Sequence, residues 1–446
     1  MFAGGPTLLS ALCLIQAEAH FDVGGRFETR VGQAPTGTVT TSGQLAEQSQ
    51  LMVVATPELG LRWIEGVDNL RADSSTRILW RPIPLYDHRP LFLESVDLAH
   101  THRPSKRSQW QLNLTGSYGE QDYTSLSQQF AAQPALPLSL TALIVNATVD
   151  ASWRSSRRTT LSLRMGALHR RTVNAPTTSS VSASTGTVQA GTTVFTLPTQ
   201  TVVMVGPQAE FALSRQSRIE LSAPLTDYDI QGLAQNQAAS FLVSSPPPDH
   251  ANYATIQPQL SLLDSLNRRH QLHIVAGLTY ARSFHGAAMG SPITPLAQVE
   301  LSSLLVRTRA TTWRSSIGAG TSWYADPILG QAVQRGNAQV NLDAELGPDW
   351  GAGLRMAFVT DVSGQLRNPA GTDAPPLDES FRSVDLSFRH RWANAVVADF
   401  GARYAERAPH LEPSNYLDVF SSVWHNRELW AFLVLTTEPR RPPRPM

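Results

Sequence analysis

Apolar and polar residues alternate along residues 143–168, LIVNATVDASWRSSRRTTLSLRMGAL. Side chains of a β-strand point alternately to its two sides, so Val145 and Val149 fall on one side and Asp150 falls on the other. Serines and arginines interrupt the alternation at residues 154–158, after which it resumes. The stretch therefore predicts a β-hairpin, which by itself would fit an ordinary half-buried antiparallel pair.

The same unit recurs along most of the chain, and no helical periodicity of comparable strength interrupts it. In one of the clearest arms, Ala338, Val340, Leu342, Ala344 and Leu346 alternate with Gln339, Asn341, Asp343 and Glu345. About 19 candidate strands can be counted, and because single-chain bacterial barrels have an even number of strands, we expect 18, with 16 and 20 as alternatives. The least regular candidates are the first, near residues 21–31, and the last, at residues 429–435.

The connections between the arms alternate in length. The short ones lie near residues 103–108, 154–158, 266–269, 347–349 and 394–395, and the long polar ones cover residues 174–200, 226–252, 360–382 and 406–415. A soluble sandwich has no reason to keep its short turns at one end, whereas a transmembrane barrel has short periplasmic turns and long external loops. The predicted fold class is all-β, a transmembrane antiparallel up-and-down β-barrel with one apolar, lipid-facing side.

The tryptophans gather beside the short turns. Most of the 10 tryptophans lie within a few residues of such a turn, namely Trp63, Trp110, Trp153, Trp313, Trp350, Trp392 and Trp424. Aromatic side chains favour the membrane interface, because one end is apolar and the other can bond to water. We therefore expect a ring of tryptophans at the periplasmic rim.

Composition narrows the class further. Only 16% of the 446 residues are charged, against roughly 25% in soluble proteins. The formal net charge is zero, which offers no basic excess for nucleic acid, so we expect no nucleic-acid partner. After the N-terminus no apolar run approaches the roughly 20 residues of a membrane helix, which excludes a helical membrane protein.

The two ends of the chain carry processing features. Residues 1–19 contain a short apolar core and then a small-residue cleavage site, so we expect a secretory signal peptide. This peptide contains Cys13, the only cysteine, so the mature chain would hold no disulfide or thiolate site. Residues 20–438 are then the barrel and residues 439–446 a Pro- and Arg-rich tail. This division leaves no room for an N-terminal plug domain, so a gated transporter built around one is not expected.

With these patterns, the chain resembles the Gram-negative outer-membrane β-barrels of the porin-like kind. The resemblance covers nearly all of residues 20–438 and is one of pattern, without a diagnostic motif. It implies a location in the bacterial outer membrane, contact with outer-membrane lipid and lipopolysaccharide, and insertion by the barrel assembly machinery.

The polar side of the predicted strands carries charges of both signs. The candidate lining residues are Arg26, Glu28, Arg30, Glu58, Arg62, Asp150, Arg164, Glu210, Glu220, Asp343, Glu345, Arg355, Asp385, Arg389, Asp399 and Arg403, and Asp97 and Glu300 follow the same pattern. One interpretation is that they pair across strands and only stabilise a wet wall. The other is a channel lining without a strong preference for either ion sign, suited to a neutral, hydroxyl-rich solute.

The sequence offers little chemistry beyond a channel. It contains no P-loop, no His-Glu-x-x-His and no Gly-x-Ser-x-Gly, so we expect no catalytic residues, no cofactor and no metal. The function predicted is an outer-membrane conduit, in one version for export of a polysaccharide together with periplasmic polysaccharide-export proteins. In the alternative it is a general diffusion porin. The rivals from other classes are a hydrolase on the barrel wall and a structural or adhesive barrel.

Overall fold

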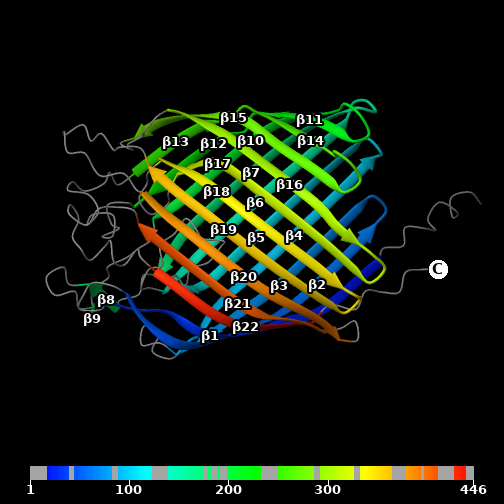
Figure 1. Cartoon of the computed structure of the whole chain (residues 1–446). Coiled ribbons are helices and arrows are strands. Elements are labelled where there is room, and N and C mark those ends of the chain that lie inside the picture. The colour runs from blue at the N-terminus through cyan, green and yellow to red at the C-terminus, as the bar shows by residue number, and fades with distance from the viewer. Residues whose placement is uncertain are drawn as a thin grey trace, which may run out of the picture.

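The fold is a closed antiparallel β-barrel (Figure 1). The computed structural model describes residues 18–39, 45–82, 89–122, 139–174, 178–181, 188–190, 198–232, 250–285, 292–325, 332–363, 378–392, 396–409 and 426–437. No helix among these residues is long and apolar enough to cross a membrane.

The strands of the barrel follow one another around the wall in sequence order. They are β1 Glu18–Val39, β2 Leu45–Glu65, β3 Asp68–Trp80, β4 Leu91–Ser105, β5 Ser108–Asp122, β6 Ser139–Arg154, β7 Thr159–Asn174, β10 Thr199–Ala212, β11 Ser217–Ser222, β12 Leu225–Gln231, β13 His250–Ile256, β14 Gln259–Asp264, β15 His270–His285, β16 Ile293–Arg307, β17 Thr311–Ala325, β18 Ala332–Leu346, β19 Trp350–Ser363, β20 Asp378–Trp392, β21 Val396–Pro409 and β22 Asn426–Thr437. A separate hairpin of β8, Thr178–Val181, and β9, Val188–Ala190, lies in the connection between β7 and β10.

Two strands of the wall are each interrupted by a proline. β11 and β12 flank Pro224, and β13 and β14 flank Pro258. Proline has no N–H for the ladder, and both halves of each strand pair with the same neighbour, β10 or β15. The 20 segments of the main sheet therefore form 20 − 2 = 18 strands, and the expected number is confirmed.

The first and last strands close the barrel. β1 pairs with β22 from Gly25↔Thr437 to Gln33↔Leu429, so the two arms that alternate least regularly in the sequence are both strands. β1 already pairs with β2 at Glu18↔Ile64, and signal-peptide cleavage after Ala19 stays a prediction.

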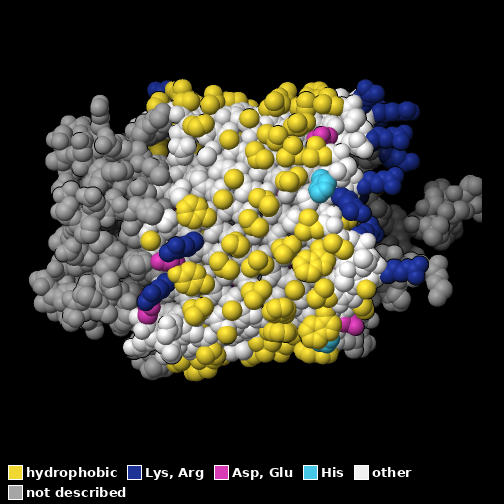
Figure 2. Space-filling model, viewed as in Figure 1, with side chains coloured by type: hydrophobic (Ala, Val, Ile, Leu, Met, Phe, Trp, Pro, Cys, Tyr) yellow, Lys and Arg dark blue, Asp and Glu magenta, His cyan; other side chains and the backbone are white. Residues whose placement is uncertain are grey.

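One side of every strand forms an apolar outer surface. Figure 2 shows hydrophobic side chains over the middle of the visible face, and Phe21, Leu59, Leu278, Ile317 and Phe358 are among the exposed ones. In water such a surface would be an aggregation hazard, whereas lipid solvates it. The exposed tryptophans Trp153, Trp313, Trp350 and Trp392 lie beside short turns, as expected. Trp80 is 37% exposed and ends β3 at the opposite end of the barrel, and Trp424 lies outside the described residues.

The short turns that the structure describes all lie at one end of the barrel, the right-hand end in Figure 1, and the turn predicted at residues 394–395 lies outside the described residues. The long connections predicted at the other end are shorter than expected, because strands continue into them. β12 and β13 take up residues 225–231 and 250–256, β19 and β20 extend to residues 363 and 378, and β21 ends at Pro409. These extensions bear side chains that contact one another inside the barrel, as described below, and such cross-strand contacts stabilise strand pairing.

Candidate channel lining

The strand register places all sixteen predicted lining residues on the inner side of the wall. Asp150 and Arg164 are direct partners on β6 and β7, and the Arg164 guanidinium Nε donates to Asp150 Oδ1 at 2.6 Å. Their neighbours Val149 and Met165, also direct partners, point to the lipid. Alternation along the strands thus separates charge from lipid one residue at a time.

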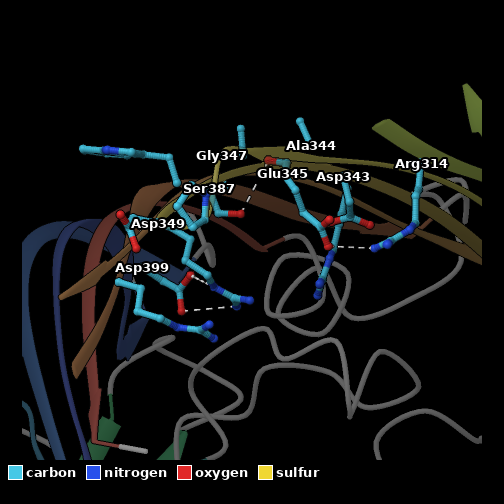
Figure 3. A pocket seen from close by; sticks show the side chains of 16 residues that line it. Arg314, Asp343, Ala344, Glu345, Gly347, Asp349, Ser387 and Asp399 are labelled. Atoms are coloured by element: carbon cyan, nitrogen blue, oxygen red, sulfur yellow. Dashed lines mark hydrogen bonds and ion pairs between the residues drawn. The ribbon is translucent and has the colours of Figure 1, made fainter. Parts of the chain in front are cut away.

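A second charged stretch lies on β17 to β21. Arg389 Nε donates to Asp399 Oδ1 at 2.8 Å, and Arg314 Nη1 donates to Glu345 Oε1 at 2.9 Å. Figure 3 shows Arg314, Glu345 and Asp343 pointing into the lumen and Ala344 pointing away from it. A cavity of 520 Å³ lies against this part of the wall.

Charges of opposite sign also alternate on other strands. Glu28 on β1 lies between two arginines and forms ion pairs with Arg30 and, at 3.0 Å, with Arg26. Arg218 on β11 pairs with Glu210 on β10 at 3.6 Å. Within the β17 to β21 stretch, Arg403 also pairs with Asp385, at 3.4 Å. Cross-strand pairing, the first interpretation of these charges, therefore accounts for many of them.

It does not account for all of them. Within the part of the chain that the structure describes, Glu58, Arg62, Glu220, Asp343 and Arg355 form no ion pair. Such residues leave charges of both signs facing the lumen, so the inner wall is polar and carries no single dominant sign.

Amides and hydroxyls fill the space between the charges. Asn113 Nδ2 donates to Thr148 Oγ1 at 3.2 Å, and Asn341 Nδ2 donates to Ser316 Oγ at 3.0 Å. Gln111 Nε2 donates to Asn113 Oδ1 at 2.9 Å. These groups keep spare donors and acceptors, which a solute with hydroxyl groups could use.

Sequence reasoning missed an ionic cluster on the inner wall at the loop end. Arg335 Nη2 donates to Asp361 Oδ2 at 2.6 Å, and the Tyr324 hydroxyl donates to the same oxygen at 3.0 Å. The Arg335 guanidinium also lies over the Tyr324 ring, 4.6 Å from its centroid. Asp361 was assigned to a loop, although it has the same parity as the inner-side residue Arg355 and so continues the alternation of β19.

It also missed apolar clusters inside the barrel. Trp430 is fully buried and packs with the inner-side residues Ala34, Met52, Val54, Leu79 and Leu91. Trp430 interrupts the apolar and polar alternation of the last arm because the inner side of that strand also packs in an apolar cluster. The signal was present, but it was taken as irregularity.

A second cluster shows that the wall bends inward. Trp323 on β17 has the same parity as the lipid-facing Ile317, yet it packs edge-on against Tyr228 and Tyr253, which face inward from β12 and β13. β17 stops pairing with β16 after Gln298↔Gly320, so its loop end is free to fold across the inner side of β12 and β13. The lumen is therefore narrower at this end.

The hydrolase alternative has two candidate Ser–His pairs. His273 Nε2 lies 2.8 Å from Ser261 Oγ, and His270 Nδ1 lies 2.9 Å from Ser303 Oγ. In a catalytic triad a carboxylate holds the second imidazole nitrogen. Within the described ranges neither histidine forms such a bond, so neither pair is assembled as a triad. No group of three or more His, Cys, Asp or Glu among the same residues could hold a metal ion.

A closed barrel with an apolar outer surface and a polar inner wall satisfies every requirement of a bilayer. Its strands pair with one another all the way around the wall, except at the loop end of β17, which leaves β16 after Gly320. The chain has the fold of a transmembrane β-barrel, the fold by which bacterial outer-membrane proteins span their membrane.

No protein-family model matches the chain, and no curated protein sequence does. A solved ferric enterobactin receptor mutant, PfeA of Pseudomonas aeruginosa, is similar with a TM-score of 0.49 and 9% identity, covering 93% of this chain and 81% of that one. The siderophore receptor PirA of Acinetobacter baumannii has a TM-score of 0.46 and 7% identity, and the match covers 93% of this chain and 80% of that one. The RagAB peptide transporter has a TM-score of 0.48 and 8% identity, and the match covers 87% of this chain and 61% of that one.

Proposed function

We propose that this barrel is an outer-membrane channel through which hydrophilic solutes cross. The observation that supports this most is the inner wall, where acids and bases alternate and some carry no partner. Porins of 16 to 18 strands leave an aqueous channel, because barrel diameter grows with strand number. A merely structural barrel has no need of unpaired charges such as Asp343 and Arg355 in its interior.

Among solutes, the lining favours neutral, hydroxyl-rich molecules. Its charges are mostly paired, so it exerts no strong net field, and its amides and hydroxyls offer donors and acceptors in short succession. A glycan is the solute class that uses such groups best. Export of a polysaccharide, with periplasmic export proteins as partners, is the specific version we propose, and a general diffusion porin is its alternative.

Liposome swelling tests this proposal. Vesicles that contain the purified protein should swell in isotonic solutions of neutral oligosaccharides faster than in solutions of charged peptides of equal mass. A general porin would instead admit both classes according to size alone. The variant Asn113→Leu with Asn341→Leu should slow sugar entry and leave chloride conductance nearly unchanged. Vesicles that swell in no solute at all would contradict the channel and favour a structural or adhesive barrel.

A further inference from the structure

The periplasmic end of the barrel carries an unusual concentration of positive charge. Five successive turns contribute exposed basic side chains, namely Arg103, Lys106, Arg107, Arg154, Arg157, Arg158, Arg215, Arg268, Arg269, Arg307 and Arg309. Figure 2 shows Lys and Arg side chains projecting beyond the end of the barrel that carries the short turns. We call this set of residues the basic arc.

The basic arc is one-sided and nearly uncompensated. Asp264, at the end of β14, is the acidic residue that falls among its turns, and its carboxylate accepts from Ser217 Oγ at 2.6 Å. Within the described residues none of the arc's side chains pairs with a carboxylate. On the other side of the rim, the turns at residues 66–67 and 347–349 carry or adjoin acids and lack basic residues. The chain as a whole has a net charge of zero, but positive charge is in strong local excess at the basic arc.

A cavity beneath the arc is lined by basic side chains. It measures 710 Å³ and lies between the turns that join β4 to β5 and β6 to β7. Arg103, Lys106, Arg107 and Arg154 line it, and no carboxylate does. Gln109 and Thr160 line it from the inner side of the wall, so it opens toward the periplasmic mouth of the lumen and away from lipid.

We propose that the basic arc is a docking surface for a periplasmic protein that presents an acidic segment, with its carboxylates seated in this cavity. Lipid headgroups fit less well, because the cavity faces the lumen and the arginine side chains project along the barrel axis. A polyanion in transit fits less well too. Above the arc, the inner sides of β10, β11 and β16 carry Glu210, Glu220 and Glu300, which would repel it.

A short fluorescent poly-glutamate peptide is the probe for this surface. Its binding to the full-length protein in detergent micelles is followed by fluorescence anisotropy. The cavity variant is Arg103→Gln with Lys106→Gln and Arg107→Gln, and the matched control removes equal charge from the arc outside the cavity, as Arg157→Gln, Arg158→Gln and Arg268→Gln. We expect the cavity variant to bind the peptide at least about tenfold more weakly than the wild type, and the control variant to lose less affinity. Added salt should weaken peptide binding to the wild type and to both variants.

Lys106 provides an independent readout because it is the only lysine of the chain. A carbodiimide couples a glutamate carboxylate to a lysine amine, so the peptide should become attached to the wild type. Lys106→Arg keeps the charge but has no side-chain amine, so it should remove the adduct that peptide mapping locates at residue 106. Retained heat-modifiable mobility in gels shows that each variant is folded.

Three results would overturn the proposal: equal weakening by the cavity and control variants, attachment of the peptide to the wild type only at sites other than Lys106, or binding of dextran sulfate or phosphatidylglycerol vesicles without binding of the peptide. The last would reassign the arc to a polyanion or to lipid. The assay measures binding and not ion flow, so its outcome is separate from that of the channel proposal.

Discussion

Gly32 and Trp430 are direct partners across the seam between β1 and β22 that closes the barrel. A Cβ atom at position 32 would lie 1.8 Å from the carbonyl oxygen of Leu429, closer than any side chain permits. The glycine therefore lets the last strand approach the first, and the buried Trp430 indole fills the space on the inner side of the seam.

Gly32→Ala should accordingly weaken closure of the barrel. Overpacking of this kind costs about 1–3 kcal/mol, and the mutant should unfold at lower urea concentration in reversible bilayer folding. Gly116→Ala is the control, because its added Cβ would meet nothing within 4 Å. If both mutants unfolded at the same urea concentration, the seam would not be where the structure has it.

Val340 and Gln339 test which side of the wall faces lipid. Val340 lies on the outer side of β18 and its neighbour Gln339 on the inner side. Arginine at position 340 should cost roughly 2–4 kcal/mol, because it places a charge in hydrocarbon, whereas arginine at position 339 should be nearly neutral. The measurement is again bilayer unfolding, and a larger loss at position 339 would invert the assignment of the faces.

Trp323 should be more important for stability than the tryptophans of the outer rim. It is 6% exposed and packs on two tyrosines, while Trp392 is 50% exposed. Trp323→Ala should cost roughly 3–5 kcal/mol and free the loop end of β17, which should also raise single-channel conductance. Trp392→Ala should cost less stability and should raise the single-channel conductance less. Unchanged conductance and stability in Trp323→Ala would show that the inward bend does not narrow the lumen.

The orientation in the membrane predicts which connections antibodies can reach. Epitope tags inserted within residues 233–249 or 364–377 should be detected on intact cells, because long connections of a barrel face outward. A tag in the turn at residues 347–349 should be detected only after permeabilisation. The reverse pattern would turn the barrel over, with the basic arc outside the cell.

Period-two alternation was enough to predict the fold and the side of each lining residue. Asp150 and Arg164, or Arg389 and Asp399, sit at polar positions of unambiguous arms, and pairing of those arms brings them together. The inward position of Trp323 could not be predicted in this way, because parity describes a regular strand and β17 leaves its neighbour after Gly320. The buried Trp430 and the cluster at Asp361 depend on which strands meet at the loop end. The local sequence pattern does not indicate which strands meet there.

Conductance of the purified protein in a planar bilayer tests the central claim most directly. The account predicts ohmic openings with weak preference for either ion sign, and a shift toward anions when Asp343 and Glu345 are both changed to Arg. Changing Asp249, in the connection 233–249, should matter less. If the channel is silent, deletion of residues 233–249 and of the other long connections should open it. A barrel that conducts in none of these forms would contradict the account.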